Sequence, residues 1–281
     1  MNIRTSTHQN GLSIIELMIA LAISSLLILG ITQIFIDNKK SYVFQRSQVN
    51  LQENARYAEL LFNSYLAKAG YRRAPDDNPE FAFPAAPSNT DCQAFTAGSS
   101  ITATTDKKGI CIRYQPLVSG EPDCLGAATP TFTDTIPFTS PGNATLVTLA
   151  IKYIEGASPD RGTISCKNTA AGTFDAMLSN VADFRLDFGV GRDITSRHLV
   201  TTGDQFVSAN TWAATTSGPI RAVRYSLLLA SAPNQRTGAS QVITNWLAGA
   251  DAASKTRLQA ADQNRLYQVA GSTRTLRSLM P

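Results

Sequence analysis

The longest hydrophobic run of the chain lies close to its N-terminus. Residues 12–36 read LSIIELMIALAISSLLILGITQIFI, which is 25 residues with a single charged side chain, Glu16. A helix rises about 1.5 Å per residue, so a run of this length is sufficient to cross the ~30 Å hydrocarbon core of a bilayer. The pattern therefore predicts a membrane-spanning helix over residues 12–36.

An amphipathic stretch follows this run, over residues 37–70. Its apolar side chains recur at helical spacing and form one stripe, which comprises Leu51, Ala55, Ala58, Phe62, Tyr65, Leu66 and Ala69. Gly70 suits the C-terminal cap of a helix, and Pro75 stops it. We expect one helix from about residue 12 to residue 69, roughly 85–90 Å long, whose second half packs on the domain that follows.

From residue 71 onward the pattern changes to the period of two that is typical of half-buried strands. The clearest alternations or β-branched runs are at residues 110–114, 145–154, 184–188 and 222–230. Stretches rich in Ala, Thr, Ser, Gly and Pro predict long loops at 84–106, 127–144 and 201–218. The expected fold is α+β: a long N-terminal helix packed on a single antiparallel sheet with long loops, residues 71–281.

Proline and glycine usage supports this division. All 13 prolines lie from Pro75 onward, and of the 18 glycines only Gly11, Gly30 and Gly70 precede it. Proline ends helices and glycine weakens them, so the chain divides into a helical rod and a loop-rich domain.

The net charge of the chain excludes few classes of function. Its net charge is +4, and its arginines are spread along the sequence, with Arg72–Arg73 and residues 257, 265, 274 and 277 as the nearest approach to clusters. We expect these side chains to be solvated surface charges. A nucleic-acid partner is not expected, because such proteins usually carry a basic patch or stripe.

The carboxylate of Glu16 is anomalous inside a hydrophobic run. A charge costs about 2.5–3.5 kcal/mol at the centre of a membrane span, and less near an interface. If the chain is cut after Gly11, Glu16 is the fifth residue of the new chain and can pair with the N-terminal ammonium of a neighbouring subunit. The alternative is a carboxylate that lies at the level of the lipid headgroups and binds nothing.

Residues 11–17, GLSIIEL, resemble the leader motif of type IV pilin-like proteins, in which glycine, a hydrophobic residue, three further residues and glutamate precede an apolar helix. The resemblance implies that residues 1–11 are a leader peptide. It also implies that a prepilin peptidase cuts between Gly11 and Leu12 and methylates the amine of Leu12. Many members of this class have phenylalanine there. Major pilins tend to have a helix-kinking proline that this chain lacks, which favours a minor subunit.

The orientation of the span follows from the motif rather than from charge. A removable secretory signal is disfavoured because no small-residue cleavage site follows the apolar run. Only Arg4 and the α-amine are positive in the leader, whereas Lys39, Lys40 and Arg46 follow the span. The positive-inside rule alone does not place the leader in the cytoplasm. The motif and the cysteines favour a cytoplasmic leader, a single pass through the inner membrane and a periplasmic domain.

Four cysteines lie on the expected exported side of the span: Cys92, Cys111, Cys124 and Cys166. An even number in an oxidising compartment indicates two disulfides. The close ligand spacing of a zinc site is absent. Spacing alone leaves all three pairings open.

Later segments are similar to the PilW family of minor pilins. They are residues 123–126, 165–166, 178–191, 220–231 and 265–267, together with Arg277. This resemblance implies the pairs Cys124–Cys166 and Cys92–Cys111. The family often ends in Arg-Asn, whereas here Arg277 is followed by SLMP, a departure that puts a role of the C-terminus in doubt.

The same resemblance implies a function. A PilW-like protein is a minor pilin that, with other minor pilins and a large PilY-type tip adhesin, forms the tip and initiation complex that primes pilus assembly. Twitching and adhesion follow from that role. Such a protein passes from the inner membrane to the pilus tip at the cell surface.

Candidate catalytic residues are few. Outside the leader the only histidine is His198, and neither a GxSxG elbow nor a P-loop pattern occurs. The aspartates Asp183, Asp187, Asp193 and Asp204 lack the spacing of an EF-hand calcium loop. We therefore expect no enzyme, cofactor, metal or small-molecule substrate.

Two alternatives to a structural subunit of the pilus tip stay open. A pseudopilin of a type II secretion system shares the leader and the helix. A DNA-binding pilin needs a basic stripe on the folded domain.

Overall fold

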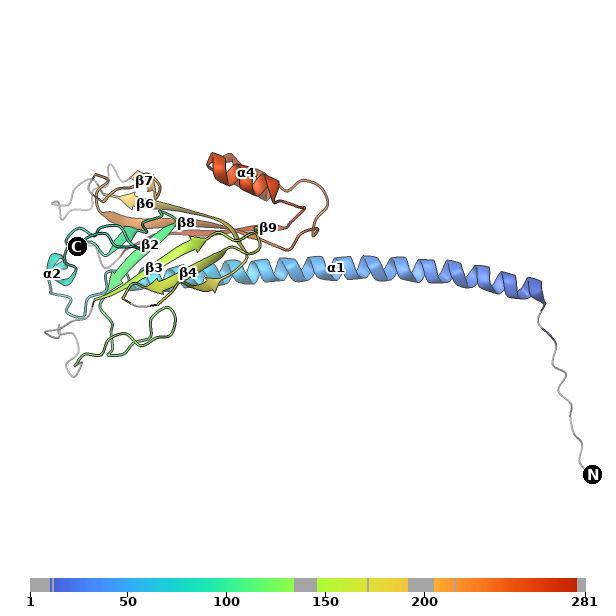
Figure 1. Ribbon diagram of the computed structural model, residues 1–281, viewed down its shortest axis with the longest axis horizontal. Helices are drawn as coiled ribbons and strands as arrows, with labels where there is room; N and C mark the ends of the chain where they lie inside the picture. The colour runs from blue at the N-terminus through green and yellow to red at the C-terminus, as the bar shows by residue number, and fades with distance from the viewer. Residues whose placement is uncertain are drawn as a thin grey trace, which may run out of the picture. The chain divides into compact units, whose positions relative to one another are not determined.

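A computed structural model describes residues 11, 13–133, 146–170, 172–191, 205–214 and 216–276. The chain divides into two compact units, Met1–Arg46 and Ser47–Pro281. The first helix, α1 (Ile14–Lys68), contributes residues to both (Figure 1).

In the first unit, α1 is exposed on all sides from its start to residue 42. Two of its hydroxyl groups bond back to the helix. Ser25 Oγ donates to the carbonyl of Ala22 at 2.8 Å, and Thr32 Oγ1 donates to the carbonyl of Ile28 at 2.7 Å. Such bonds satisfy hydroxyls where no water is present, so they suit a helix in apolar surroundings.

In the second unit, α1 buries the stripe that the periodicity predicts. The buried side chains on the helix are Leu51, Ala55, Ala58, Leu61, Phe62 and Leu66. Tyr65 is half-buried, and Leu61 is an addition to the predicted stripe. Gly70 adopts φ 75° and donates its N–H to the carbonyl of Arg113 at 2.9 Å, which ends the helix where the sequence indicates.

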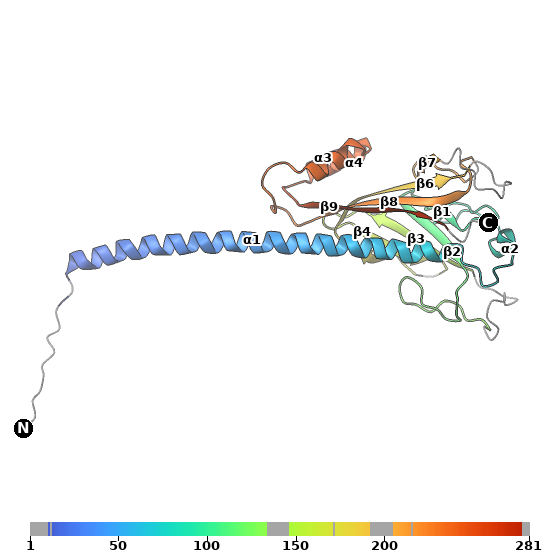
Figure 2. The ribbon, with the colours of Figure 1, turned by 180° about the vertical axis from the view of Figure 1, so that it is seen from behind.

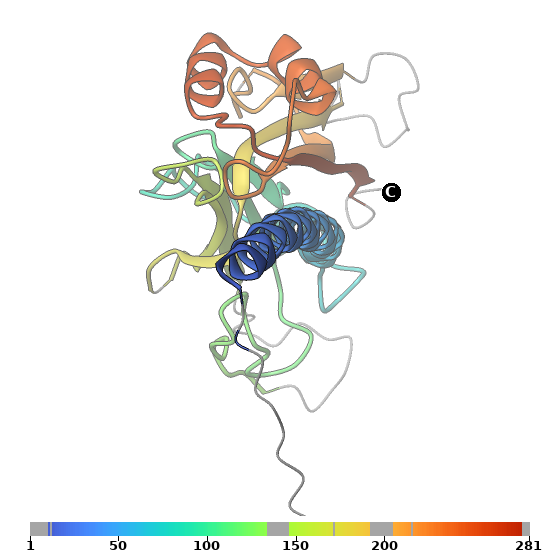
Figure 3. The same ribbon diagram turned by 90° about the vertical axis from the view of Figure 1, so that its right-hand side faces the viewer.

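The described residues form two antiparallel sheets where one was expected (Figures 1 and 3). The five-stranded sheet comprises, in order, β1 (Ile101–Ala103), β2 (Gly109–Tyr114), β3 (Val147–Ile154), β4 (Thr163–Asn168) and β5 (Asp175–Leu178). The four-stranded sheet has the order β7 (Gln205–Ser208), β6 (Val181–Val190), β8 (Ile220–Ala230) and β9 (Tyr267–Thr275). The predicted α+β class with antiparallel pairing is confirmed, and the expectation of a single sheet is wrong.

The chain changes sheets at a two-residue connection between β5 and β6. Asn180 has φ 65° in this turn, which redirects the strand instead of closing a hairpin in one sheet. Tyr153 Oη of β3 then donates to the carbonyl of Ala182 in β6 at 2.9 Å. Periodicity identifies half-buried strands but not their neighbours, which explains the wrong expectation.

Two of the predicted loops contain strands. Residues 84–106 include β1, and residues 201–218 include β7. The first stretch, with the short helix α2 (Pro79–Ala82) before it, covers the outer face of the five-stranded sheet through a cluster of Cys92, Phe95, Cys111 and Ala150. All six residues of β2 are consequently buried, although its sequence alternates. Residues 134–144 of the third predicted loop lie outside the described residues.

Helices α3 (Gln241–Ala248) and α4 (Ala252–Ala260) have no counterpart among the predicted elements. They pack on the outer face of the four-stranded sheet (Figure 3). The cluster there joins Ile243, Trp246 and Leu258 of the helices to Leu228 and Tyr267 of the sheet.

Three arginines are buried instead of solvated, which corrects the reading of the charge pattern. Arg73, Arg113 and Arg265 are at most 5% exposed. Arg113 Nη1 donates to the carbonyl of Pro84 at 2.7 Å, and its guanidinium lies 4.0 Å from the ring centre of Phe95. Burial lowers the pKa of Arg113 to about 10, so this side chain still carries its charge at neutral pH.

The stripe of α1 yields a test of the core. Phe62 is 1% exposed and stacks on Tyr225 with ring centres 4.3 Å apart. Phe62→Ala should lower the free energy of unfolding by about 3–5 kcal/mol, because it leaves a cavity between the helix and the sheet. The measurement is guanidinium unfolding of the full chain in detergent micelles. It is followed by fluorescence of Trp212 and Trp246, the only tryptophans of the chain.

Leu60→Ala is the matched control, because Leu60 lies on the same helix and is 68% exposed. Its effect should stay within about 0.5 kcal/mol. Equal losses in the two variants would contradict the packing described.

Candidate functional site: the start of the N-terminal helix

Glu16 lies in the first turn of α1, five residues after Gly11. The N–H of Leu17 donates to the carbonyl of Ser13 at 3.1 Å, so the helix is formed from its first residues. A carboxylate in the first turn also complements the helix dipole, which stabilises a helix by about 0.3–1 kcal/mol. Glu16 therefore has a modest local role, whatever it binds elsewhere. Leu12 and residues 1–10 of the expected leader lie outside the described residues.

The apolar surface of α1 is the largest feature without cover in the first unit. The helix qualifies as a membrane span by length and composition, with a mean hydropathy of 2.6 over 18 residues, none of them buried. Its side chains are widely exposed, from Ile14 at 81% to Ile36 at 40%. Soluble monomers rarely leave an apolar surface of this extent in water. An apolar medium such as a bilayer therefore suits this surface.

Among the described residues, no group of three or more histidine, cysteine or acidic side chains could hold a metal ion. Asp183 accepts a hydrogen bond from Trp246 Nε1 at 2.7 Å and faces Arg257 Nη2 at 3.2 Å. Burial raises the pKa of Asp183, and these two donors oppose the rise. Asp187 pairs with Arg224 at 3.0 Å. Asp183 and Asp187 thus make contacts within the folded domain.

Three residues that the sequence singled out for chemistry lie outside the described residues. They are Asp193, His198 and Asp204.

The four cysteines form two disulfides, Cys92–Cys111 and Cys124–Cys166. Their Cα atoms are 5.9 and 6.3 Å apart, within the usual range for a bridge. This is the pairing that the PilW resemblance implies. The first bridge fixes the segment over the outer face of β2, and the second fixes the loop after β2 to β4.

The segments that resemble PilW build the domain. Asp123 Oδ1 accepts the N–H groups of Leu125 and Ala127 at 2.8 and 3.0 Å, and Gly126 between them has φ 79°. Arg265 Nη1 donates to the carbonyl of Ser231 at 2.7 Å and is fully enclosed. These residues close turns and join strands of the domain. Arg277 lies outside the described residues.

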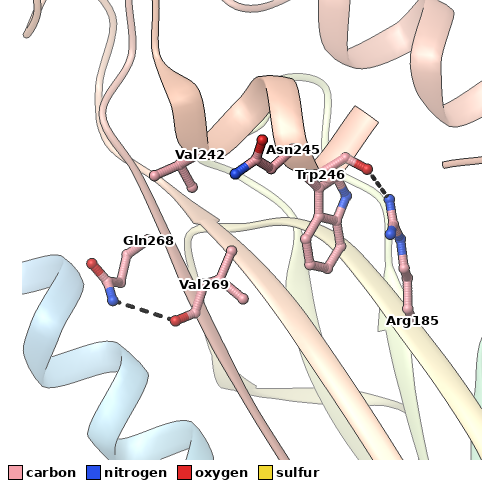
Figure 4. A pocket seen from close by; sticks show the side chains of 6 residues that line it. All are labelled: Arg185, Val242, Asn245, Trp246, Gln268 and Val269. Atoms are coloured by element: carbon pink, nitrogen blue, oxygen red, sulfur yellow. Dashed lines mark hydrogen bonds between the residues drawn. The ribbon is translucent and has the colours of Figure 1, made fainter. Parts of the chain in front are cut away.

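Two open cavities of about 400 Å³ each border α3. The first is lined by Arg185, Val242, Asn245, Trp246, Gln268 and Val269 (Figure 4). Arg185 stacks 4.0 Å from the indole centre of Trp246 and donates to the carbonyl of the same residue. Histidine and cysteine are absent from the lining of both cavities.

Comparison with known proteins supports the reading of the N-terminus. Residues 6–32 match the family described as the prokaryotic N-terminal methylation motif. The match includes Gly11, Glu16 and the first turns of α1, so the chain carries a prokaryotic N-terminal methylation motif there.

The type IV-like pilin TTHA1219 from Thermus thermophilus aligns with a TM-score of 0.36 and 12% identity. The alignment covers 82% of this chain and 96% of that chain. No curated protein matches the sequence at a significant level.

Gly11 offers a direct test of processing. An added Cβ at this residue meets no atom within 4 Å, so a substitution there leaves the described chain undisturbed. We expect Gly11→Val to prevent removal of the leader, because the bulk falls at the bond that the peptidase must approach. Intact-mass analysis should show a methylated N-terminal Leu12 in the wild type and residues 1–11 retained in the variant. Ser13→Ala is the control and should be cut normally. A wild-type chain that retains its leader would overturn the assignment.

The disulfides predict a graded loss of stability. Thiol labelling of the denatured wild-type chain should find no free cysteine. Replacing both Cys124 and Cys166 by serine should cost about 2–5 kcal/mol of unfolding free energy, because the bridge spans 42 residues. Replacing Cys92 and Cys111, which are 19 residues apart, should cost about 0.7 kcal/mol less by loop entropy. Reactive thiols in the wild type, or an unchanged stability of both variants, would contradict the two bridges.

Proposed function

We propose that the chain is a minor pilin of the PilW type, a structural subunit of the tip and initiation complex of a type IV pilus. The observation that carries the proposal is the start of α1. A methylation motif leads there into a helix that is apolar all round and carries one carboxylate, Glu16, in its first turn. The protein acts by assembly, without catalysis, cofactor or small-molecule substrate.

The exposed helix supports a two-stage path. In the inner membrane, lipid covers the side chains from Ile14 to Ile36. On assembly, the helices of neighbouring subunits replace the lipid. Prepilin peptidase acts at the first stage, on the bond between Gly11 and Leu12.

Glu16 provides the polar contact of the second stage. A carboxylate in an apolar filament core is costly unless it is paired. The amine of Leu12 on a neighbouring subunit supplies an opposite charge. At a separation of ~4 Å such a pair gains about 4 kcal/mol at an effective dielectric constant near 20. The pair therefore offsets the cost of the carboxylate and selects the axial register between subunits.

The folded domain, residues 71–281, is periplasmic in the membrane-bound state and lies at the pilus tip after assembly. The partners are other minor pilins and a PilY-type adhesin, and loss of the complex impairs twitching and adhesion. We propose no nucleic-acid partner, and the buried Arg73, Arg113 and Arg265 do not contribute to a basic surface.

The alternative is a pseudopilin of a type II secretion system, which has the same leader and helix. The PilW-like segments and the two disulfides favour the pilus.

Deletion of the gene distinguishes the two functions. We expect the deletion to reduce surface pili and twitching and to leave the amount of secreted enzymes unchanged. Sheared pili are quantified by immunoblot, twitching by the width of the subsurface zone, and secretion by activity in the medium. Normal piliation together with failed secretion would refute the pilus function and favour the pseudopilin.

Complementation of the deletion tests Glu16. Glu16→Ala should be cut, inserted and folded, yet should fail to restore pili, because the intersubunit pair is missing. Glu53→Ala on the exposed side of the same helix is the control and should restore them. Intact mass and the amount of the variant in the membrane show whether it is processed and inserted normally. If it is, a failure to restore pili is a failure of assembly and not a result of the lost helix-dipole contribution. Full rescue by processed Glu16→Ala would remove the assembly role.

A further inference from the structure

The two sheets end in four edge strands, and three of these are short. Strand β1 has three residues, and β5 and β7 have four residues each, whereas β9 has nine. Proteins usually protect an open sheet edge by keeping the edge strand short or by covering it. Among the edge strands that the described residues form, β9 is therefore the one long enough to pair with another strand.

The direction of its backbone groups follows from two hydrogen bonds. The N–H of Leu276 donates to the carbonyl of Arg221 at 2.9 Å, and the carbonyl of Leu266 accepts from Ser231 at 2.9 Å. The backbone N–H and C=O groups of the even-numbered residues in this stretch thus point toward β8. Successive residues of a strand point their N–H and C=O groups to opposite edges, and β9 pairs with β8 without a register shift. The backbone groups of the odd-numbered residues Val269, Gly271 and Thr273 therefore point away from β8, toward the open edge of the sheet.

These outward groups have no backbone partner within the described part of the chain. Val269, Gly271 and Thr273 are all exposed. The carbonyl of Val269 receives a single long contact of 3.3 Å from the side chain of Gln268, the residue before it. The edge is thus a row of donors and acceptors in the spacing that an extended strand matches.

An apolar area adjoins this edge on the outer face of the sheet. Val269 is 42% exposed and Val242 of α3 is 36% exposed, and both line the cavity that also contains Trp246 (Figure 4). A residue of an added strand opposite Val269 would place its Cβ about 4.5–5.5 Å away. An apolar side chain at that point would contact both valines.

A second copy of the chain is a poor occupant of the edge. Ser47 bonds to Gln235, whose N–H donates to the carbonyl of Asn264 just before β9, and Asn63 bonds to Arg274 near the end of β9. Residues 47–68 of α1 and strand β9 therefore run in the same direction (Figure 2). Symmetric antiparallel pairing of β9 with its copy would point the two helices in opposite directions. Two chains anchored in one membrane cannot adopt that arrangement.

We propose that β9 binds an extended segment of a different exported protein, which adds a strand to the four-stranded sheet. The segment pairs with the outward groups of Val269, Gly271 and Thr273 and spans about seven residues. It carries an apolar side chain opposite Val269 and Val242. The exclusion of a second copy and the exported location of the partner rest on the proposed membrane-anchored function.

Hydrogen–deuterium exchange tests the pairing in the full chain. In detergent micelles, the amides of Val269, Gly271 and Thr273 should exchange fast, while those of Ala270 and Ser272, which face β8, should be protected. In isolated cell envelopes the outward amides should exchange about tenfold or more slowly. Fragmentation of the peptide that covers residues 266–276 separates the two sets.

Two pairs of variants identify the contact. Thr273→Pro removes an outward N–H and leaves the ladder to β8 intact, so it should abolish the added protection at Val269 and Gly271. Thr273→Ala keeps that N–H and should retain the protection. Val269→Lys should also abolish it, whereas Val118→Lys, at a valine that is 51% exposed and far from β9 in the sequence, should not. Inward amides that stay protected show that each variant is folded.

Several outcomes would overturn the proposal. Fast exchange of the outward amides in envelopes would do so, as would unchanged protection in Thr273→Pro. Cross-linking of β9 to β9 in envelopes would replace the partner with a second copy. Piliation is scored on the same strains, and because exchange is measured in envelopes rather than in pili, a failed pilus function and a failed strand pairing give separate results.

Discussion

The packing of the second half of α1 against two sheets is the interaction on which the rest of the domain depends. Phe62 stacks on Tyr225 and Phe184 of the four-stranded sheet, with ring centres 4.3 and 5.6 Å apart. The same buried cluster contains Leu149 and Ile164 of the five-stranded sheet. Neither sheet can exclude water from its apolar inner face alone, because such a face needs a second layer packed against it. The helix is therefore a component of the core, and burial around Phe62 raises the pKa of Tyr225 to about 12.

The outer faces of the sheets are closed by different means. Over the five-stranded sheet lies a non-periodic segment, held by the Cys92–Cys111 bridge and by hydrogen bonds from Arg113 to carbonyl groups. Over part of the four-stranded sheet lie α3 and α4, held by Trp246 and by its bond to Asp183. A buried guanidinium is costly unless it is hydrogen-bonded, so Arg113 also selects the path of the loop that surrounds it. Directional polar contacts thus fix the path of the loops, whereas periodic apolar faces fix the packing of the sheets.

This difference explains how much of the fold the sequence could predict. The helix and the strand around Phe184 were predictable because each keeps one apolar face over several residues. Strands β1, β5 and β7 have three or four residues, too few for a period of two to emerge. Helix α3 reads QVITNWLA, and its β-branched residues disfavour a helix. Its packing on the sheet overrides that local preference. Arg113 and Arg265 were expected at the surface because a sequence does not display the carbonyl groups that bind them.

The candidate site was predictable for the opposite reason. Glu16 is a local exception, a charge in a hydrophobic run beside Gly11, and such an exception is visible without any partner. The open edge of β9 has no such signature. Its existence depends on the order of the strands, and its unpaired groups belong to the backbone, which every residue shares.

The two uncovered surfaces impose different demands on their surroundings. The apolar part of α1 needs any medium that excludes water, because hydrophobic burial has no direction, so lipid and neighbouring helices are interchangeable there. The edge of β9 needs donors and acceptors at fixed spacing, which lipid cannot supply and an extended strand can. Under the proposed function the helix would allow transfer from membrane to filament, whereas the proposed contact at the edge would discriminate between partners. A subunit that carries both can enter an assembly through a general contact and take a defined place in it through a specific one.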